Sequence, residues 1–188
     1  MKRFLVLFSV VLFGACSNLS DSVEESSKFE QGKEIAGKSF QALSGKLMQA
    51  MGKGGPENAI GFCNVEALPL TDSLAKHFGV TIKRSALKYR NAENKPDSSE
   101  LAALIQYSEE IAQGDQPKPY MIHVNGKEKF IAPIPTKSLC LVCHGVPGVN
   151  ITEAVAEKIN DTYPDDMAIG FQEGDLRGIW SITFNNYP

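Results

Sequence analysis

The sequence predicts an α+β domain, in which helices come first and the strands of an antiparallel sheet come later. Apolar residues recur at intervals of three and four through most of residues 29–78, which is typical of helices. Asn125-Gly126 separates two β-rich runs and indicates an antiparallel hairpin. A further β-rich run, residues 176–184, lies close to the C-terminus. A chain of 188 residues is long enough to form one such domain with a proper core.

Three helices are expected in the N-terminal half. The first covers residues 29–51, and Gly54-Gly55-Pro56 ends it, because neither glycine nor proline continues a helix well. The second covers residues 57–65. The third runs from about residue 70 to residue 78 and ends at Gly79, a residue that readily adopts the left-handed conformation found after helices.

A strand and a capped helix are expected next. The stretch VTIKRS, residues 80–85, is short and β-branched, which favours a strand. Asp97 is followed three residues later by Glu100, and this spacing predicts a capping box at the start of a helix that continues to Gly114.

The C-terminal half contains the clearest local signal. Residues 120–124 are expected to pair with residues 127–131 across a type I′ turn at Asn125-Gly126. A helix is expected over residues 152–162, and a last strand over residues 176–184.

The first fifteen residues have the layout of an export signal. Lys2 and Arg3 precede an apolar run of about ten residues, whereas a membrane-spanning helix needs about 20. Gly14-Ala15-Cys16 then resembles the end of a bacterial lipoprotein signal, in which the cysteine is lipidated and becomes the mature N-terminus. An ordinary cleaved signal is the alternative. We therefore expect residues 1–15 to be removed and a lipid on Cys16 to anchor the protein at the periplasmic side of a bacterial membrane.

Residues 16–28 are rich in serine and acidic residues and contain almost nothing to bury, which favours a flexible tether. The folded domain is then expected over residues 29–188. The formal net charge of the whole chain is −3, and loss of Lys2 and Arg3 with the signal makes it more acidic. This charge argues against a nucleic-acid partner, because phosphate binding needs clustered positive charge.

The stretch CLVCH places Cys140 and Cys143 three positions apart, with His144 directly after them. A structural zinc site needs four ligands, usually as two separated pairs, and the chain has one such pair. A dithiol redox motif usually follows the first strand of a βαβ unit, whereas this pair lies late, behind a hairpin. Covalent attachment of one haem c uses all three residues. Cys140 and Cys143 then form the thioethers, and His144 is an axial ligand of the iron.

The sixth ligand of the iron remains open from the residues alone. An unpaired thiol in an exported protein is a liability unless something occupies it, and this places Cys63 slightly ahead. The other candidates in the chain are His77, His123, Met48, Met51, Met121 and Met167.

Four stretches, AIGFCNVEALP, KRSALKYRNAENKPDSSEL, CLVCHG and YPDDMAIGFQEGDLRG, occur in this order over residues 30–184. Together they resemble a bacterial and cyanobacterial family of PAS-like domains that carry one covalent c-type haem. The resemblance implies a PAS-like fold, attachment through Cys140 and Cys143, and axial ligation by His144 and Cys63. Three arginines are candidates to pair with the haem propionates, and a solvated or structural salt-bridge role is the alternative for each: Arg84, Arg90 and Arg177.

Two functions follow from this prediction. The first is a membrane-anchored periplasmic protein that transfers electrons or responds to redox state, because a six-coordinate haem has no free position for a substrate. The second is a sensor of redox state or of a gas such as CO or NO, which signals through a partner protein. A peroxidase-like enzyme needs an open iron and a distal acid or base, and His77 and His123 give it little support. The redox partner is not identified by the sequence.

Overall fold

A four-stranded antiparallel sheet lies at the centre of the part of the chain that the structure describes. The structure is a computed structural model that describes residues 17–185, with the side chains from residue 24 onward. The strands have the order β1-β4-β3-β2. Their bounds are Val80–Ser85 (β1), Tyr120–Val124 (β2), Lys127–Pro135 (β3) and Leu176–Phe184 (β4).

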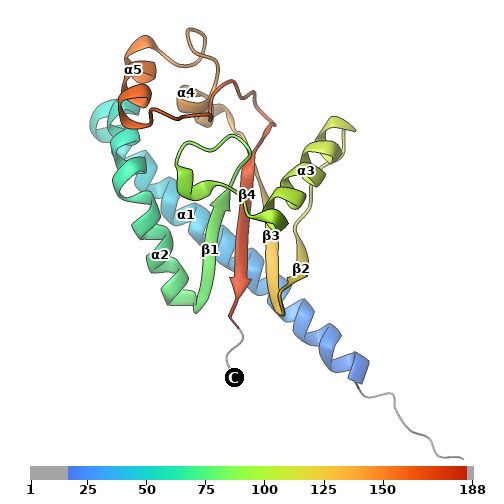
Figure 1. Cartoon of the computed structure of the whole chain (residues 1–188). Coiled ribbons are helices and arrows are strands. Elements are labelled where there is room, and N and C mark those ends of the chain that lie inside the picture. The colour runs from blue at the N-terminus through green and yellow to red at the C-terminus, as the bar shows by residue number, and fades with distance from the viewer. Residues whose placement is uncertain (1–16, 186–188) are drawn as a thin grey trace, which may run out of the picture.

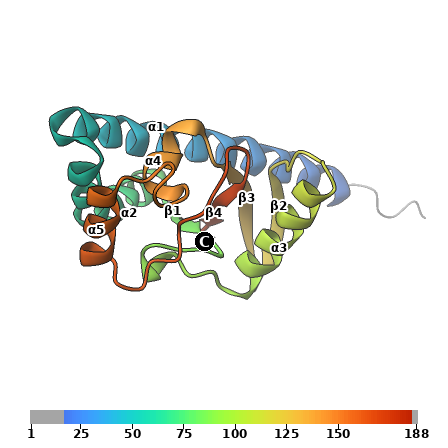
Figure 2. The same cartoon turned by 90° about the horizontal axis from the view of Figure 1, so that it is seen from above.

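Helices cover both faces of this sheet. Helices α1 and α2 pack on one face and α3 on the other, as Figure 1 and Figure 2 show, while α4 and α5 lie beyond one end of the strands. The bounds of the helices are Ser17–Val65 (α1), Ala67–Phe78 (α2), Ser98–Ala112 (α3), Leu141–His144 (α4) and Glu153–Thr162 (α5), with short 3-10 turns at Ala92–Asn94 and Ser138–Cys140.

The two central strands supply apolar side chains to two separate cores. In β4, Ile182 packs toward α1 and α2, and Ile179 packs toward α3. In β3, Phe130 and Ile131 divide in the same way, and all four side chains are fully buried. Successive side chains of a strand point to opposite faces, so both faces of the sheet are closed by helices. A third, smaller core joins α5 to the last part of α1.

Helix α1 is broken at the glycines where the sequence predicts an end. Gly54 and Gly55 leave the helical conformation, and Gly55 has a φ of 69°, which glycine adopts without strain. Pro56 follows at the start of the second helical segment, where its missing N–H costs little. The break confirms the two predicted helices, and it turns the segment that carries Cys63 away from the line of the first.

Several other local predictions are confirmed. Asp97 and Glu100 form the capping box at the start of α3. Asn125 and Gly126 have φ values of 52° and 73°, as a type I′ turn requires, and the strands on either side pair in the predicted register. Strands β1 and β4 have the predicted bounds, and Thr152 caps α5.

Strand β3 is longer than predicted, because it continues past residue 131 to Pro135. Proline in a sequence run argues against a central strand, since it cannot donate to the ladder. Here β2 pairs with β3 only as far as Ile131, so the later residues of β3 have a strand partner on one side, which is β4. Pro133 and Pro135 are tolerated on this unpaired side.

The chain before residue 29 differs from the predicted tether. Its backbone is helical from Ser17, as the beginning of α1, and Lys28 forms an ion pair with Glu128 of β3. A 2.7 Å ion pair between Lys28 and Glu24 supports the same turn of helix. The described backbone over residues 17–28 is thus helical, whereas the sequence favours a flexible tether there. Cys16 and the predicted signal, residues 1–15, lie outside the described residues. None of the described helices combines the length and apolar character that crossing a bilayer requires.

Two glycines of α1 provide a test of how closely this helix packs on the sheet. A Cβ atom at Gly32 would lie 2.6 Å from Cδ2 and 2.7 Å from Cβ of Phe130, whereas a Cβ at Gly37 would meet nothing within 4 Å. We expect Gly32→Ala to lower the free energy of unfolding by about 1–3 kcal/mol, because the contact with Phe130 cannot be relieved without moving the helix. Gly37→Ala is the matched control, and it should raise the free energy of unfolding by about 0.5–1 kcal/mol. Urea denaturation measures both. Equal stabilisation by the two changes would contradict the close packing.

Candidate functional site

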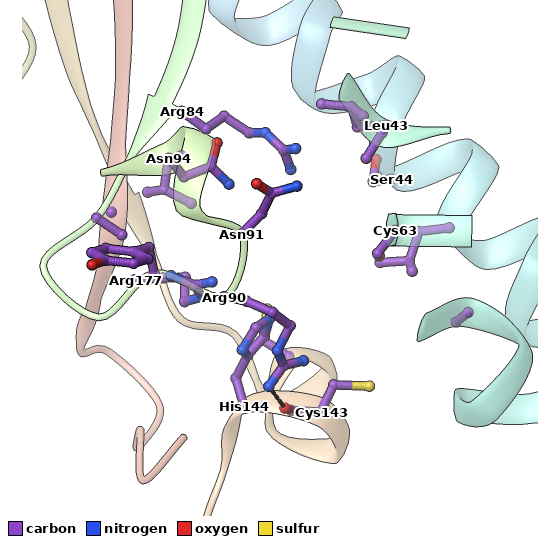
Figure 3. A pocket seen from close by; sticks show the side chains of 18 of the residues that line it. Leu43, Ser44, Cys63, Arg84, Arg90, Asn91, Asn94, Cys143, His144 and Arg177 are labelled. Atoms are coloured by element: carbon purple, nitrogen blue, oxygen red, sulfur yellow. Dashed lines mark hydrogen bonds between the residues drawn. The ribbon is translucent and has the colours of Figure 1, made fainter. Parts of the chain in front are cut away.

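A cavity of about 260 Å³ lies where α1 passes the end of the sheet, beside α4. The α1 side of the cavity is mainly apolar, whereas the side formed by the sheet and the loop after β1 carries arginine and asparagine side chains (Figure 3). The apolar lining includes Phe40, Leu43, Leu47, Met51 and Ile60, and the polar lining includes Arg84, Arg90, Asn91, Asn94 and Arg177.

All the residues that the sequence assigns to the cofactor line this one cavity: Cys63, Arg84, Arg90, Cys140, Cys143, His144 and Arg177. They come from separate parts of the fold. Cys63 lies on the segment of α1 after the break, and His144 ends α4 (Figure 3). Arg84 and Arg177 lie on the adjacent strands β1 and β4. The fold therefore places these residues together, while their roles remain predictions.

The structure also narrows the candidates for the sixth ligand. Cys63 and Met51 line the cavity. His77 lies at the end of α2, where its ring contacts Phe78 at 4.8 Å between centroids. His123 lies in the hairpin, with its Nε2 3.5 Å from Glu128, as expected for a cross-strand pair. The described lining residues do not include these two histidines, nor Met48, Met121 or Met167.

One ring nitrogen of His144 has a defined partner. Nδ1 lies 2.7 Å from the carbonyl oxygen of Ala168, and a carbonyl only accepts, so Nδ1 carries the proton and donates it. Burial lowers the pKa of His144 well below its ordinary value, and the positive charges of Arg177 and Arg90 lower it further. The ring is therefore neutral at neutral pH, and Nε2 keeps the lone pair that a metal needs.

Arg90 is fixed by protein groups on several sides. Its Nε and Nη2 donate to the two carboxylate oxygens of Asp166 at 3.1 and 3.0 Å, and both side chains are buried. Nη2 also donates to the carbonyl oxygens of Cys143, at 2.7 Å, and Ala168, at 3.2 Å. Of the two roles that the sequence leaves open for Arg90, the structure contains the salt bridge.

Arg84 and Arg177 have no carboxylate within ion-pair distance among the described residues. The Nε of Arg84 is buried without a hydrogen-bond partner. Arg177 donates to the carbonyl of Lys88 at 3.2 Å, and its guanidinium lies over the ring of Phe171. Burial lowers the pKa of both groups, that of Arg177 to about 10. An arginine side chain keeps its charge in proteins, and two partly buried charges without a counterion favour an anionic ligand in the cavity.

The three described cysteines, Cys63, Cys140 and Cys143, are free thiols. Burial raises the pKa of Cys63, although the nearby arginines oppose this, and it raises the pKa of Cys143 to about 11. In the described part of the chain, no group of three or more His, Cys, Asp or Glu side chains could hold a metal ion, whereas structural zinc needs four ligands.

Sequence reasoning did not assign a role to several residues of this site. Asp166 and Ala168 belong to the stretch YPDDMAIG, and Asn91 and Asn94 belong to the loop after β1. These stretches carry the family resemblance, so their presence was visible. Tyr163 also lines the cavity, and burial raises its pKa to about 12. The contacts of Asp166 with Arg90 and of Ala168 with His144 join residues far apart in the chain, and no local sequence pattern predicts them.

The thiol of Cys143 should react slowly in the folded chain without a cofactor. A pKa of about 11 instead of 9.0 leaves about 100-fold less thiolate near neutral pH. Alkylation by iodoacetamide, followed by mass spectrometry of the peptides, should be at least about tenfold slower in the folded chain than in urea, because the higher nucleophilicity of a thiolate with a raised pKa offsets part of this factor. The rate in the folded chain should rise with pH up to about 11. Equal rates for Cys143 in the folded and unfolded chains would contradict the buried thiol.

Comparison with known proteins shows the family of this chain and supports its fold. A family model described as Tll0287-like matches residues 16–185. Among solved structures, the crystal structure of the cyanobacterial haem-protein Tll0287 is similar, with a TM-score of 0.58 and 22% sequence identity over 93% of this chain and 98% of that chain. At this identity the similarity shows the fold. No curated protein matches. Because the family model covers all of the described residues, the chain belongs to the Tll0287-like family.

Proposed function

We propose that this protein binds one covalent haem c and acts in electron transfer or redox response. Cys140 and Cys143 form the thioethers, and His144 and Cys63 are the axial ligands of the iron. The observation that carries the proposal is that Cys63, the CxxCH residues and two arginines without a carboxylate partner among the described residues, Arg84 and Arg177, line one cavity. The family match and the likeness to a solved haem-protein support it. The four-stranded sheet with its covering helices is then a PAS-like haem domain.

The residues of the cavity fit the two chemical parts of a haem. The porphyrin is flat and apolar, and the cavity offers Phe40, Leu43 and Leu47 from α1. The propionates are anions, and the buried Nε of Arg84 lacks a partner. Arg84 and Arg177 are therefore assigned to the propionates. Arg90 already has Asp166 as its counterion, and we assign it no propionate.

The axial residues are prepared for their roles to different extents. When bound, the haem iron supplies a one-electron couple between its ferric and ferrous states. His144 is neutral and bonded at Nδ1, so its Nε2 is available without loss of a proton. Cys63 must lose a proton to become a thiolate, and burial opposes this loss. The charges of Arg84, Arg90 and Arg177 favour the thiolate, and a ferric iron favours it more strongly.

A sensor remains the second candidate, and the burial of Cys63 favours it. If Cys63 held a haem iron, the buried environment that raises the pKa of its thiol would favour the protonated, unbound form, and would do so more beside a ferrous than beside a ferric iron. An unbound Cys63 would leave the iron accessible to CO or NO. Signalling would require a partner protein.

The proposed place of the protein is the periplasmic side of a bacterial membrane, with a lipid on Cys16 as anchor. This part of the proposal rests on the sequence of residues 1–16, where a basic start, a short apolar run and Gly14-Ala15-Cys16 follow one another. Export also provides the compartment in which covalent haem attachment takes place.

Covalent attachment is tested by the pigment. The full chain, purified from a host that has the haem-attachment machinery, should be red and should stay red after denaturation and acid-acetone extraction, because thioethers survive both treatments. Replacing Cys140 and Cys143 together with alanine should remove the covalent pigment, whereas the control Cys63→Ser should retain it. A colourless wild-type chain from such a host would overturn the proposal.

Binding of CO to the reduced protein, in the presence and absence of Cys63, distinguishes electron transfer from sensing. For electron transfer, Cys63 stays bound in both states, so the reduced wild-type protein should bind CO slowly. Cys63→Ser should shift the Soret band and bind CO rapidly, because serine is a poor iron ligand. Absorbance spectra after mixing with CO measure both. Rapid CO binding by the reduced wild-type protein selects the sensor, and an unchanged spectrum in Cys63→Ser excludes Cys63 as a ligand.

A further inference from the structure

The buried guanidinium of Arg90 connects three segments around His144. Arg90 belongs to the loop after β1, and it binds Asp166 through two hydrogen bonds, at 3.1 and 3.0 Å. The same Nη2 reaches the carbonyl of Cys143 at 2.7 Å and that of Ala168 at 3.2 Å. The exposed fractions of the Arg90 and Asp166 side chains are 9% and 5%, so these bonds form largely out of water. Figure 3 shows Arg90 directly beside His144 and Cys143.

The carbonyl of Ala168 is shared between two donors. It accepts from Nδ1 of His144 at 2.7 Å and from Nη2 of Arg90 at 3.2 Å. Asp166 also accepts from the N–H of Ala168 at 2.9 Å, so both the N–H and the carbonyl of this residue are hydrogen-bonded. Two backbone bonds hold the following residues against the motif, from Gly170 to the carbonyl of Gly145 and from Phe171 to the carbonyl of His144.

Sharing has an electronic consequence for the imidazole. A carbonyl that accepts from Nδ1–H draws that proton and makes the ring more basic at Nε2. A charged second donor on the same oxygen reduces the negative charge that the oxygen offers to Nδ1–H. Arg90 therefore weakens the bond between His144 and Ala168, and it keeps Nε2 a weaker electron donor than a histidine whose carbonyl partner is unshared.

We propose that Arg90, held by Asp166, is a positioning residue for His144 that sets the strength of its bond to Ala168. Through this bond, Arg90 raises the reduction potential of an iron bound to His144, because a weaker donor stabilises the ferric state less. The effect on the iron rests on the proposed function. The effect on the hydrogen bond stands on protein groups alone.

Two variants change the strength of the hydrogen bond from His144 Nδ1–H to the carbonyl of Ala168 in opposite directions. In Arg90→Lys a positive charge still lies beside Asp166. A single ammonium cannot replace the planar guanidinium, which reaches both Asp166 and the carbonyl of Ala168. The bond from Nδ1–H to Ala168 should strengthen, and the potential should fall. In Asp166→Asn the oxygen that accepts from Ala168 is retained, but Arg90 loses its counterion and polarises the carbonyl more. That bond should weaken, and the potential should rise.

Lys88→Gln is the matched control. Lys88 contacts the same segment, donating to the carbonyl of Ile169 at 3.4 Å and lying over the ring of Phe171, but it does not touch Ala168 or His144. Lys88→Gln removes one positive charge near the site but leaves both donors to the Ala168 carbonyl in place. The Nδ1–H resonance of His144 should therefore stay at its wild-type position.

The experiment combines NMR with redox titration of the full-length chain. The Nδ1–H proton resonance of His144 should move downfield in Arg90→Lys and upfield in Asp166→Asn, and the midpoint potential should fall and rise in parallel. A wild-type ring without a proton on Nδ1, or unchanged resonances in both variants, would overturn the inference. If either variant does not fold, the other still decides it. If the wild-type chain attaches no haem, the proposed function fails, and the NMR comparison on the haem-free chain still decides the hydrogen-bond role.

Discussion

The packing of α1 across one face of the sheet is the contact on which the remaining structure depends. Gly32 lies against the Phe130 ring with no room for a side chain, and Ile35, Ala36 and Leu43 continue the same contact into the core. The helix extends past the sheet, and its later residues become one wall of the cavity. A helix that sat farther from the sheet would leave this wall too distant from Arg84 and Arg177. The close contact at Gly32 thus sets the width of the site.

The cavity has one positively charged side and one apolar side. Arginine side chains from β1, β4 and the loop after β1 lie on one side, and apolar side chains of α1 lie on the other. His144 stays neutral between them because it is buried near positive groups. Such a distribution suits a flat ligand with an apolar body and an anionic edge, and the described lining residues include no carboxylate that would repel that edge.

Local features of the fold were predictable because they depend on neighbouring residues. The capping box at Asp97, the turn at Asn125-Gly126 and the break at Gly54-Gly55 each follow from the conformations open to a few side chains. The end of β3 was not predictable, since Pro133 and Pro135 are tolerated only where β2 is absent from that side. The helical backbone over residues 17–28 also escaped prediction, because it continues a helix whose packing begins farther along the chain.

The candidate site was also predictable only where it depends on residues that are neighbours in the sequence. The spacing of Cys140, Cys143 and His144 is a local pattern, whereas their meeting with Cys63 depends on the whole fold. The pair of Arg90 and Asp166 joins residues 76 positions apart, so the sequence offers a salt bridge as one of two roles for Arg90 without naming Asp166 as its partner. Composition and periodicity carry no information about which of the three arginines finds a carboxylate.

The break in α1 divides the support of the site between two cores. The segment after the break, which carries Cys63, buries Ile60 against Ile151, Val155 and Ile159 of the α5 side. Arg84 and Arg177 belong instead to strands anchored in the main core under α1. The segment that carries Cys63 is therefore held at two points, by the small core through Ile60 and by the main core through Ala67, where α2 begins. The position of Cys63 relative to Arg84 and Arg177 depends on the packing of both cores, although Cys63 belongs to neither.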